Sequence, residues 1–180
     1  GISAESGIDT FRSAGGLWEQ YPVEQVATPE GFAADPALVH HFYNLRRAAL
    51  GTVKPNKAHS ALAKLQAHQR AKGGSLTIVT QNVDNLHERG GAKDVIHMHG
   101  ILTSMLCEAC EWRWNFEGES SPETQCPACH TQGTPRPDIV WFGEMPYDME
   151  TLFAHLAEAD VFAAIGTSGN VYPAAGFVAE

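Results

Sequence analysis

Four cysteines constrain the fold of this chain more than any other feature. They form two Cys-x-x-Cys pairs separated by fifteen residues, and the chain has no other cysteine. Four thiolates can close a tetrahedral shell around zinc, with bonds of about 2.3 Å, and leave no open position for water or substrate. We therefore expect a structural zinc ion in a small module over residues 103–135. Its ligands would be Cys107, Cys110, Cys126 and Cys129.

Other interpretations of the cysteines fit the pattern less well. A redox dithiol would need only one Cys-x-x-Cys motif, and scattered structural disulfides would not gather all four residues in one segment. His130 directly follows Cys129 and could compete as a ligand, but four sulfurs already satisfy the ion. Reduced, metal-binding cysteines predict a reducing, cytoplasmic setting.

Size and charge limit the classes of partner. The chain has 180 residues, of which 43% are hydrophobic and 18% charged, enough for one substantial domain or for a main domain with a small satellite. Twelve basic and twenty-one acidic residues give a net charge of −9, which argues against broad binding to nucleic acid or an anionic membrane. No apolar run is long enough to span a membrane, and no leader suggests secretion. Both ends look cut, so we expect a longer protein.

Outside the cysteine module, candidate strands alternate with candidate helices. Short apolar or β-rich runs that end in small or polar residues are typical of buried parallel strands. They cover residues 75–82, 138–144 and 160–168. Helical patterns cover residues 36–50, 57–72 and 147–160. This order predicts an α/β fold with a mostly parallel sheet. On the first helix the expected apolar stripe is Leu38, Phe42, Leu45 and Ala49.

Polar residues collect where the candidate strands end. The segment TQNVDNLH supplies Gln81, Asn82 and Asp84 within four residues, although a capped helix start would also explain them. The segment GISAESGIDTFR (residues 1–12) combines glycines, small residues and an arginine, as a phosphate-binding loop would. The shorter GTSG at residues 166–169 is a weaker signal of the same kind.

Two histidines stand two residues apart in DVIHMHG, so His97 and His99 would share one face of a strand. Because the cysteines already provide a complete metal site, neither histidine is needed as a ligand. From the spacing alone, a catalytic base and a pair of core histidines both remain open.

Taken together and in this order, the motifs resemble the sirtuin family of NAD-dependent protein-lysine deacylases. The matching segments are GISAESGIDTFR, TQNVDNLH, HMHG, the paired Cys-x-x-Cys module, WFGEMP and GTS, which span essentially the whole chain. The resemblance implies a Rossmann-like NAD-binding domain from residues 1–12, 74–102 and 136–180. Residues 13–73 would form a cofactor loop and a helical module, and residues 103–135 the zinc module.

The resemblance also implies roles for individual residues. His99, the histidine before Gly100, matches the general base, whereas His97 would pack or bond locally. The NAD contacts would be Gly1, Ala4, Asp9, Phe11, Arg12, Gln81, Asn82, Asp84, Gly166, Thr167 and Ser168. An acyl-lysine peptide would add a strand along a segment that includes Val140, Phe142, Gly143 and Glu144.

The implied reaction explains these residue types. The acyl oxygen of the substrate lysine attacks the ribose carbon of NAD, and the products are nicotinamide, O-acyl-ADP-ribose and free lysine. An amide oxygen is a weak nucleophile, so the site must hold NAD close and exclude water. A ribose hydroxyl must then lose a proton, and histidine suits this step because its pKa lies near working pH.

The choice of acyl group depends on FYNLRR, where Tyr43 and Arg46 lie three apart and share a helix face. An arginine beside apolar neighbours usually only covers them with its stem. However, Tyr-x-x-Arg is similar to the pair in bacterial CobB-like class III sirtuins that handles malonyl- and succinyl-lysine, and Ala14 matches a position that leaves room for longer acyl chains. Spacing does not exclude Arg47 as the arginine concerned. We expect removal of succinyl, malonyl and acetyl groups.

Two other functions compete with deacylation. The chain could be a zinc-ribbon binding module without catalysis, or it could transfer ADP-ribose to proteins in an NAD-dependent reaction. Under the deacylase interpretation the partners are acylated lysine side chains, with no direct nucleic-acid or membrane binding, and the protein is expected to be a monomer.

Overall fold

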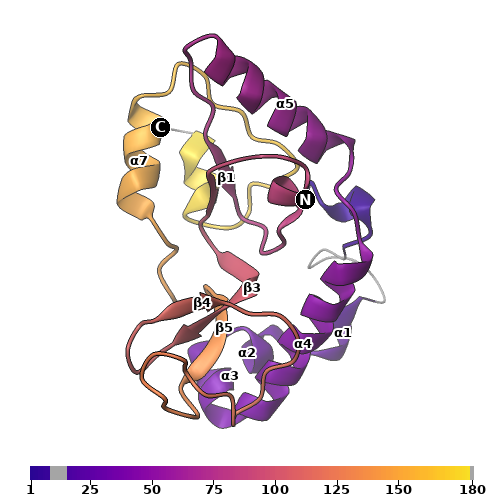
Figure 1. Cartoon of the computed structure of the whole chain (residues 1–180), viewed down its shortest axis with the longest axis vertical. Coiled ribbons are helices and arrows are strands. Elements are labelled where there is room, and N and C mark those ends of the chain that lie inside the picture. The colour runs from indigo at the N-terminus through magenta and orange to yellow at the C-terminus, as the bar shows by residue number, and fades with distance from the viewer. Residues whose placement is uncertain (9–15, 179–180) are drawn as a thin grey trace.

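A small parallel sheet forms the centre of one end of the molecule. The computed structural model describes residues 1–8 and 16–178. In it, strand β1 (Ile78–Thr80) pairs in parallel with β2 (Val95–His97), with Ile78 opposite Val95. Helix α5 (Lys57–Ala71) packs against this pair from one side, and α7 (Met149–Ala157) and the 3-10 helix η2 (Ala174–Val178) from the other (Figure 1). The predicted α/β fold is confirmed.

A second sheet occupies the other end of the long axis in Figure 1. Its strand order is β4 (Arg113–Asn115), β3 (Gly100–Cys107) and β5 (Pro135–Ile139), and both pairings are antiparallel. The prediction of a parallel strand over 138–144 was therefore wrong, because the strand begins three residues earlier and pairs with the zinc module. Prolines at both 135 and 137 suit its position at the edge of the sheet.

Four helices pack beside the second sheet. The short helices α1 (Leu17–Gln20), α2 (Val23–Val26) and α3 (Pro29–Ala34) precede the long helix α4 (Pro36–Thr52). The Asp35 side chain accepts a hydrogen bond from the Leu38 amide, and Pro36 follows it, which explains where α4 begins. The helical module and the sheet share one apolar core that includes Phe42, Tyr43 and Trp141.

The buried face of α4 differs from the predicted stripe. Leu45 and Ala49 are exposed, whereas Val39, Tyr43 and Leu50 are buried together with the expected Phe42. The helix also buries polar residues, because it faces the zinc module as well as the apolar core.

Polar contacts join α4 to the loop of the zinc module. His40 Nδ1 lies 2.8 Å from Ser120 Oγ, and Asn44 donates to the Ser120 carbonyl over 2.8 Å. Arg47 donates to the carbonyls of Leu102 and Gly118. Burial lowers the pKa of His40 to about 4, so this ring stays neutral in the contact at neutral pH.

The remaining elements are short. They are the 3-10 helix η1 (Ala4–Ser6) and helix α6 (Leu86–Arg89). The expected strand over 160–168 is not formed, and its apolar residues Val161, Phe162 and Ile165 are exposed. In the described part of the chain, none of the helices has the length and apolar character required to cross a membrane.

Gly100 is the point where the two sheets meet. Its φ of +80° is a conformation that side chains disfavour, and an added Cβ would lie 2.0 Å from the Asp138 carbonyl oxygen. Only glycine allows the first residue of β3 to lie this close to the β5 backbone.

We expect Gly100→Ala to destabilise the fold by about 3 kcal/mol or more, because it combines an unfavourable φ with a backbone clash. Gly118→Ala is the matched control, since Gly118 has a similar φ of +92° but open space around the added Cβ. Its cost should be about 1–2 kcal/mol. Urea unfolding measures the free energy of unfolding of both variants. Equal losses would show that the close approach of Gly100 to the Asp138 carbonyl does not contribute to the cost.

Candidate functional site

His99 lies between β2 and β3, at the carboxyl end of the parallel sheet. Its Nδ1 lies 3.1 Å from the Gln81 carbonyl oxygen, to which it can only donate, so Nε2 is left unprotonated in the neutral ring. Burial lowers the pKa of His99 below its ordinary value of 6.5, although the bond to Gln81 acts in the opposite direction. The ring is therefore neutral near pH 7, and no described residue bonds to Nε2. This is the state that a general base needs.

His97 is occupied by protein contacts. Its Nε2 lies 2.7 Å from Glu88 Oε1, and its Nδ1 lies 3.4 Å from the Asn82 carbonyl oxygen. The two histidines thus face successive carbonyl groups, those of Gln81 and Asn82, but only His99 keeps a ring nitrogen without a described partner. The geometry supports the assignment of His99, rather than His97, as the base.

Side chains from three segments meet near the end of β1. Gln81 Nε2 donates to Thr167 Oγ1 over 3.3 Å, and Asn82 Nδ2 donates to Ser3 Oγ over 2.9 Å. The structure therefore brings the start of the chain, the segment after β1 and the GTS segment together, as the motifs predict for a cofactor site.

Two glycines in this cluster allow a close approach of backbone to backbone. A Cβ on Gly1 would lie 2.4 Å from the Gly166 carbonyl oxygen, and a Cβ on Gly166 would lie 2.6 Å from the Ile2 nitrogen. Gly166 also has a φ of +63°. The start of the chain and the GTS segment therefore pack backbone against backbone, which brings the small and polar residues of both segments to one place.

The other predicted cofactor residues are less informative. Asp84 is 4% exposed, and its Oδ1 accepts a hydrogen bond from the Leu86 amide. This contact agrees with the alternative interpretation of the segment as a capped helix start. Ala4 and Ser168 are exposed. Asp9, Phe11, Arg12 and Ala14 lie outside the described residues.

His59 belongs to this cluster but was not identified from the sequence. It is fully buried at the start of α5, where its Nδ1 accepts the Asn56 amide hydrogen. Its Nε2 is therefore protonated and lies 3.2 Å from Ser3 Oγ. The available signal was PNKAH, a capping box with histidine in place of the usual Glu or Gln.

Tyr43 and Arg46 lie together on α4. The Tyr43 hydroxyl accepts a hydrogen bond from Trp141 Nε1 over 2.9 Å, and burial raises the pKa of Tyr43 to about 12 although the Arg46 charge opposes this shift. The Arg46 guanidinium lies over the rings of Trp18, Phe42 and Tyr43, at 5.1 to 5.6 Å from their centroids. Burial also lowers the pKa of Arg46. Among described residues no carboxylate forms an ion pair with it.

Arg47, the competing arginine, has structural partners. It is 7% exposed, and besides its two carbonyl acceptors it donates to Asn44 Oδ1 over 2.9 Å. Its guanidinium is thus committed to the contact between α4 and the zinc module, which favours Arg46 as the arginine available to a ligand.

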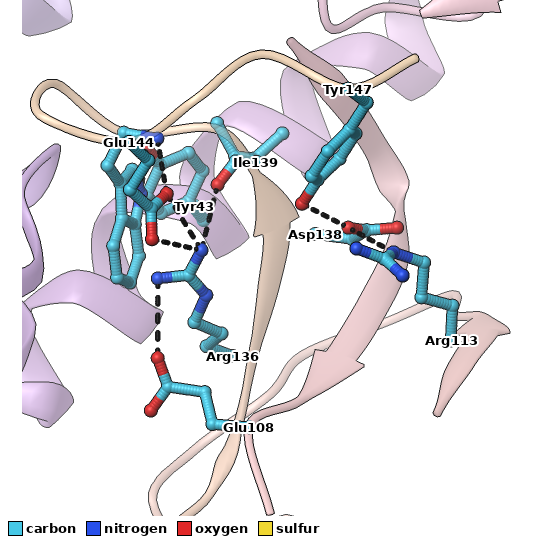
Figure 2. A network of polar contacts seen from close by, with 9 residues as sticks. Tyr43, Glu108, Arg113, Arg136, Asp138, Ile139, Glu144 and Tyr147 are labelled. Atoms are coloured by element: carbon cyan, nitrogen blue, oxygen red, sulfur yellow. Dashed lines mark hydrogen bonds and ion pairs between the residues drawn. The ribbon is translucent and has the colours of Figure 1, made fainter. Parts of the chain in front are cut away.

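The predicted peptide-binding segment follows β5 but is not itself a regular strand. The Val140 amide donates to the His99 carbonyl and the Phe142 amide to the Ala27 carbonyl, both over 3.0 Å. Phe142 and Gly143 are exposed, and a Cβ on Gly143 would meet nothing within 4 Å. Glu144 instead turns inward, where it accepts from the Trp141 amide and pairs with Arg136 (Figure 2).

The four cysteines converge as predicted. All four sulfurs lie within 4.8 Å of one another, with Cys107 Sγ 3.6 Å from Cys129 Sγ and Cys110 Sγ 3.7 Å from Cys126 Sγ. A tetrahedron of thiolates around zinc has edges of about 3.8 Å, so the cluster has the right size for the ion. His130 supplies no atom to it. The cluster is a zinc-ribbon site.

Comparison with known proteins identifies close relatives. The profile of the Sir2 family matches residues 1–173. An NAD-dependent protein deacylase of Caulobacter vibrioides is 54% identical over the whole chain, which spans 76% of that protein. The Escherichia coli protein of the same name is 55% identical, and the chain spans 64% of it.

Solved structures agree with this result. A Sir2 homologue in complex with NAD superposes with a TM-score of 0.86 at 40% identity, over 99% of this chain and 69% of that one. A Sir2 protein bound to a deacetylated p53 peptide and 3′-O-acetyl ADP ribose gives a TM-score of 0.74 at 33% identity, over 98% of this chain and 72% of that one.

Loss of one cysteine should release the metal. We expect Cys126→Ser to reduce bound zinc from about one ion per chain to almost none and to lower the melting temperature, because a three-thiolate site binds zinc much more weakly. His130→Ala should retain the metal. Elemental analysis and thermal unfolding measure both effects, and full zinc retention in Cys126→Ser would contradict the four-cysteine site.

Proposed function

The chain belongs to the Sir2 family, and from this premise we propose that it removes acyl groups from protein lysines in an NAD-dependent reaction. Acyl-lysine, NAD and one water molecule would give nicotinamide, O-acyl-ADP-ribose and free lysine. The observation that carries the proposal is the His99 ring, which is neutral and has no described partner at Nε2, beside the cluster of Gly1, Asn82 and Thr167.

The cluster residues would hold the dinucleotide. When bound, NAD would supply an electrophilic ribose carbon with nicotinamide as its leaving group. The phosphates would lie beside the packed segments of Gly1 and Gly166, near Ala4, Thr167 and Ser168. Asn82 and Gln81 would bond polar groups of the sugar, and Asp84 the nicotinamide amide. Asp9, Phe11 and Arg12 are assigned to the cofactor loop from the resemblance.

His99 would accept a proton from a ribose hydroxyl at Nε2. The Gln81 carbonyl fixes the tautomer and the orientation of the ring, so the free lone pair is directed without any rearrangement. General-base catalysis of this kind contributes about a hundred- to ten-thousandfold to a rate.

Two features support acidic acyl groups as substrates beside acetyl. Arg46 is half-buried beside Tyr43 and has no ion-pair partner in the described chain, so a ligand carboxylate would pair with it. Tyr43 keeps its proton at any working pH and can donate it to the same carboxylate. The peptide would lie along Val140, Phe142, Gly143 and Glu144, where Gly143 faces open space.

The rival functions are separable by product. A non-catalytic zinc ribbon would release no nicotinamide, and an ADP-ribosyltransferase would leave ADP-ribose on the protein, which mass spectrometry detects. We further propose that the protein acts in the cytoplasm as a monomer on acylated proteins and does not bind nucleic acid, consistent with its net charge of −9.

The first prediction separates the histidines. His99→Ala should reduce turnover by about a hundredfold or more, whereas His97→Ala should change it far less, because His97 is engaged by Glu88 and not by substrate. In the wild type, kcat/KM should fall as pH drops through a pKa below 6.5, since protonation removes the base. Nicotinamide release measures both effects. Equal losses in two folded variants would reject the assignment.

The second prediction tests the acyl class with acetyl-, malonyl- and succinyl-lysine peptides, each with and without NAD. All three should be consumed only with NAD. Arg46→Met should raise the ratio of succinyl KM to acetyl KM by about tenfold or more, because a charge-assisted pair is lost. Arg47→Met serves as the control, which should reduce stability and leave that ratio unchanged. A proportional loss on both peptides in Arg46→Met would make Arg46 structural.

A further inference from the structure

The hydrogen bond between Trp141 and Tyr43 has only one possible direction. An indole N–H is a donor without acceptor capacity, so the Tyr43 oxygen must accept it over the observed 2.9 Å. The single proton of the Tyr43 hydroxyl is then directed elsewhere, and no described residue accepts it. Because the pKa of Tyr43 is raised to about 12, that proton is present throughout the working pH range.

We infer that Trp141 is a positioning residue for acidic acyl groups. Its indole N–H holds the Tyr43 oxygen so that the hydroxyl proton remains available to a carboxylate bound by Arg46, whose guanidinium lies 5.6 Å from the Tyr43 ring. This inference rests on the proposed function and deepens it, because it assigns part of the acyl selectivity to a residue outside the Tyr-x-x-Arg motif.

Trp141 is itself held on several sides. The Arg136 guanidinium lies 3.8 Å from the centroid of its ring, and the Phe32 ring packs at 5.3 Å. Its backbone amide donates to Glu144 Oε2 over 2.8 Å. The indole therefore has little freedom to turn its N–H away from Tyr43.

Arg136 connects Trp141 to the zinc module. The side chain is 3% exposed, and Figure 2 shows it between Glu108 and Glu144. It pairs with Glu144 at 2.8 Å and with Glu108, which stands inside the first Cys-x-x-Cys motif, at 3.4 Å. A buried guanidinium tolerates little displacement from its partners, because an unpaired charge is costly in the interior. The Trp141 ring thus packs on a guanidinium that is paired with carboxylates of two segments.

The test uses Trp141→Phe, which keeps a ring against Arg136 and Phe32 but deletes the N–H. Anisotropy of labelled peptides gives the dissociation constants for succinyl- and acetyl-lysine, and it requires no turnover. The ratio of the succinyl to the acetyl dissociation constant should rise by about tenfold, since one hydrogen bond to a charged group is weakened. If Trp141 has only a structural role, its replacement should weaken the binding of both peptides by the same factor, and this result would overturn the inference.

A double-mutant cycle with Tyr43→Phe sharpens the result. If Trp141 acts through the Tyr43 hydroxyl, Trp141→Phe should not change the ratio further once that hydroxyl is gone. Additive effects of the two substitutions would contradict the inference. Should Trp141→Phe not fold, the indole N–H resonance of Trp141 in the wild type gives the answer. It should shift more with succinyl- than with acetyl-lysine peptide, and equal shifts would count against the role.

Failure of this inference is distinguishable from failure of the proposed function. Nicotinamide release from an acetyl-lysine peptide tests deacylation and does not depend on Trp141 acting on carboxylates. If the wild type deacetylates but binds succinyl-lysine no better than acetyl-lysine, the positioning role is overturned and the deacylase function stands. If no peptide is turned over but the ratio of dissociation constants rises in Trp141→Phe, the deacylase function is overturned and the positioning role stands.

Discussion

The buried charge of Arg136 is the interaction that holds the predicted peptide segment to the zinc module. Removing a guanidinium from water is unfavourable unless acidic groups surround it, and here they come from two different segments. Glu108 belongs to the zinc module and Glu144 to the predicted peptide segment (Figure 2). The need of the Arg136 charge for acidic partners therefore ties the zinc module to the segment that would bind substrate.

The same strand carries an opposite charge two residues later. Asp138 is buried and accepts from Ser104, Arg113 and the Tyr147 hydroxyl, as Figure 2 shows in part. The segment after β5 is thus anchored at its start through Arg136 and at its end through Tyr147. Both anchors are polar and directional, so they specify the path of the segment more closely than apolar packing alone would.

Local chemistry made some features predictable. Ligand spacing identified the cysteine cluster. The helices expected over residues 36–50 and 57–72 both form, and each begins directly after a capping side chain, Asp35 or Asn56. The buried face of α4 could not be predicted in the same way, because an apolar stripe ignores buried polar residues such as His40 and Arg47. Their partners Ser120 and Gly118 lie more than seventy residues away in the sequence.

The strands were harder to place for a related reason. An apolar run such as DIVWFG suits a strand, but it suits equally a segment packed in a core, and only the pairing partner decides. Over 160–168 the described chain offers no such partner. Similarly, the spacing of His97 and His99 does not distinguish them, because the difference is that His97 alone contacts Glu88. The proposed role of Trp141 depends on its hydrogen bond to Tyr43 of α4, which the sequence does not show.

The close pairing of Gly100 with β5 has a consequence for the residue before it. The His99 carbonyl accepts the Val140 amide hydrogen, and the next residue lies directly on β5, so the imidazole and the peptide segment are attached to one rigid piece of backbone. The distance between His99 and a lysine chain on the predicted peptide segment would then be fixed before either ligand binds. Side chains elsewhere around that lysine would be able to differ without changing this distance.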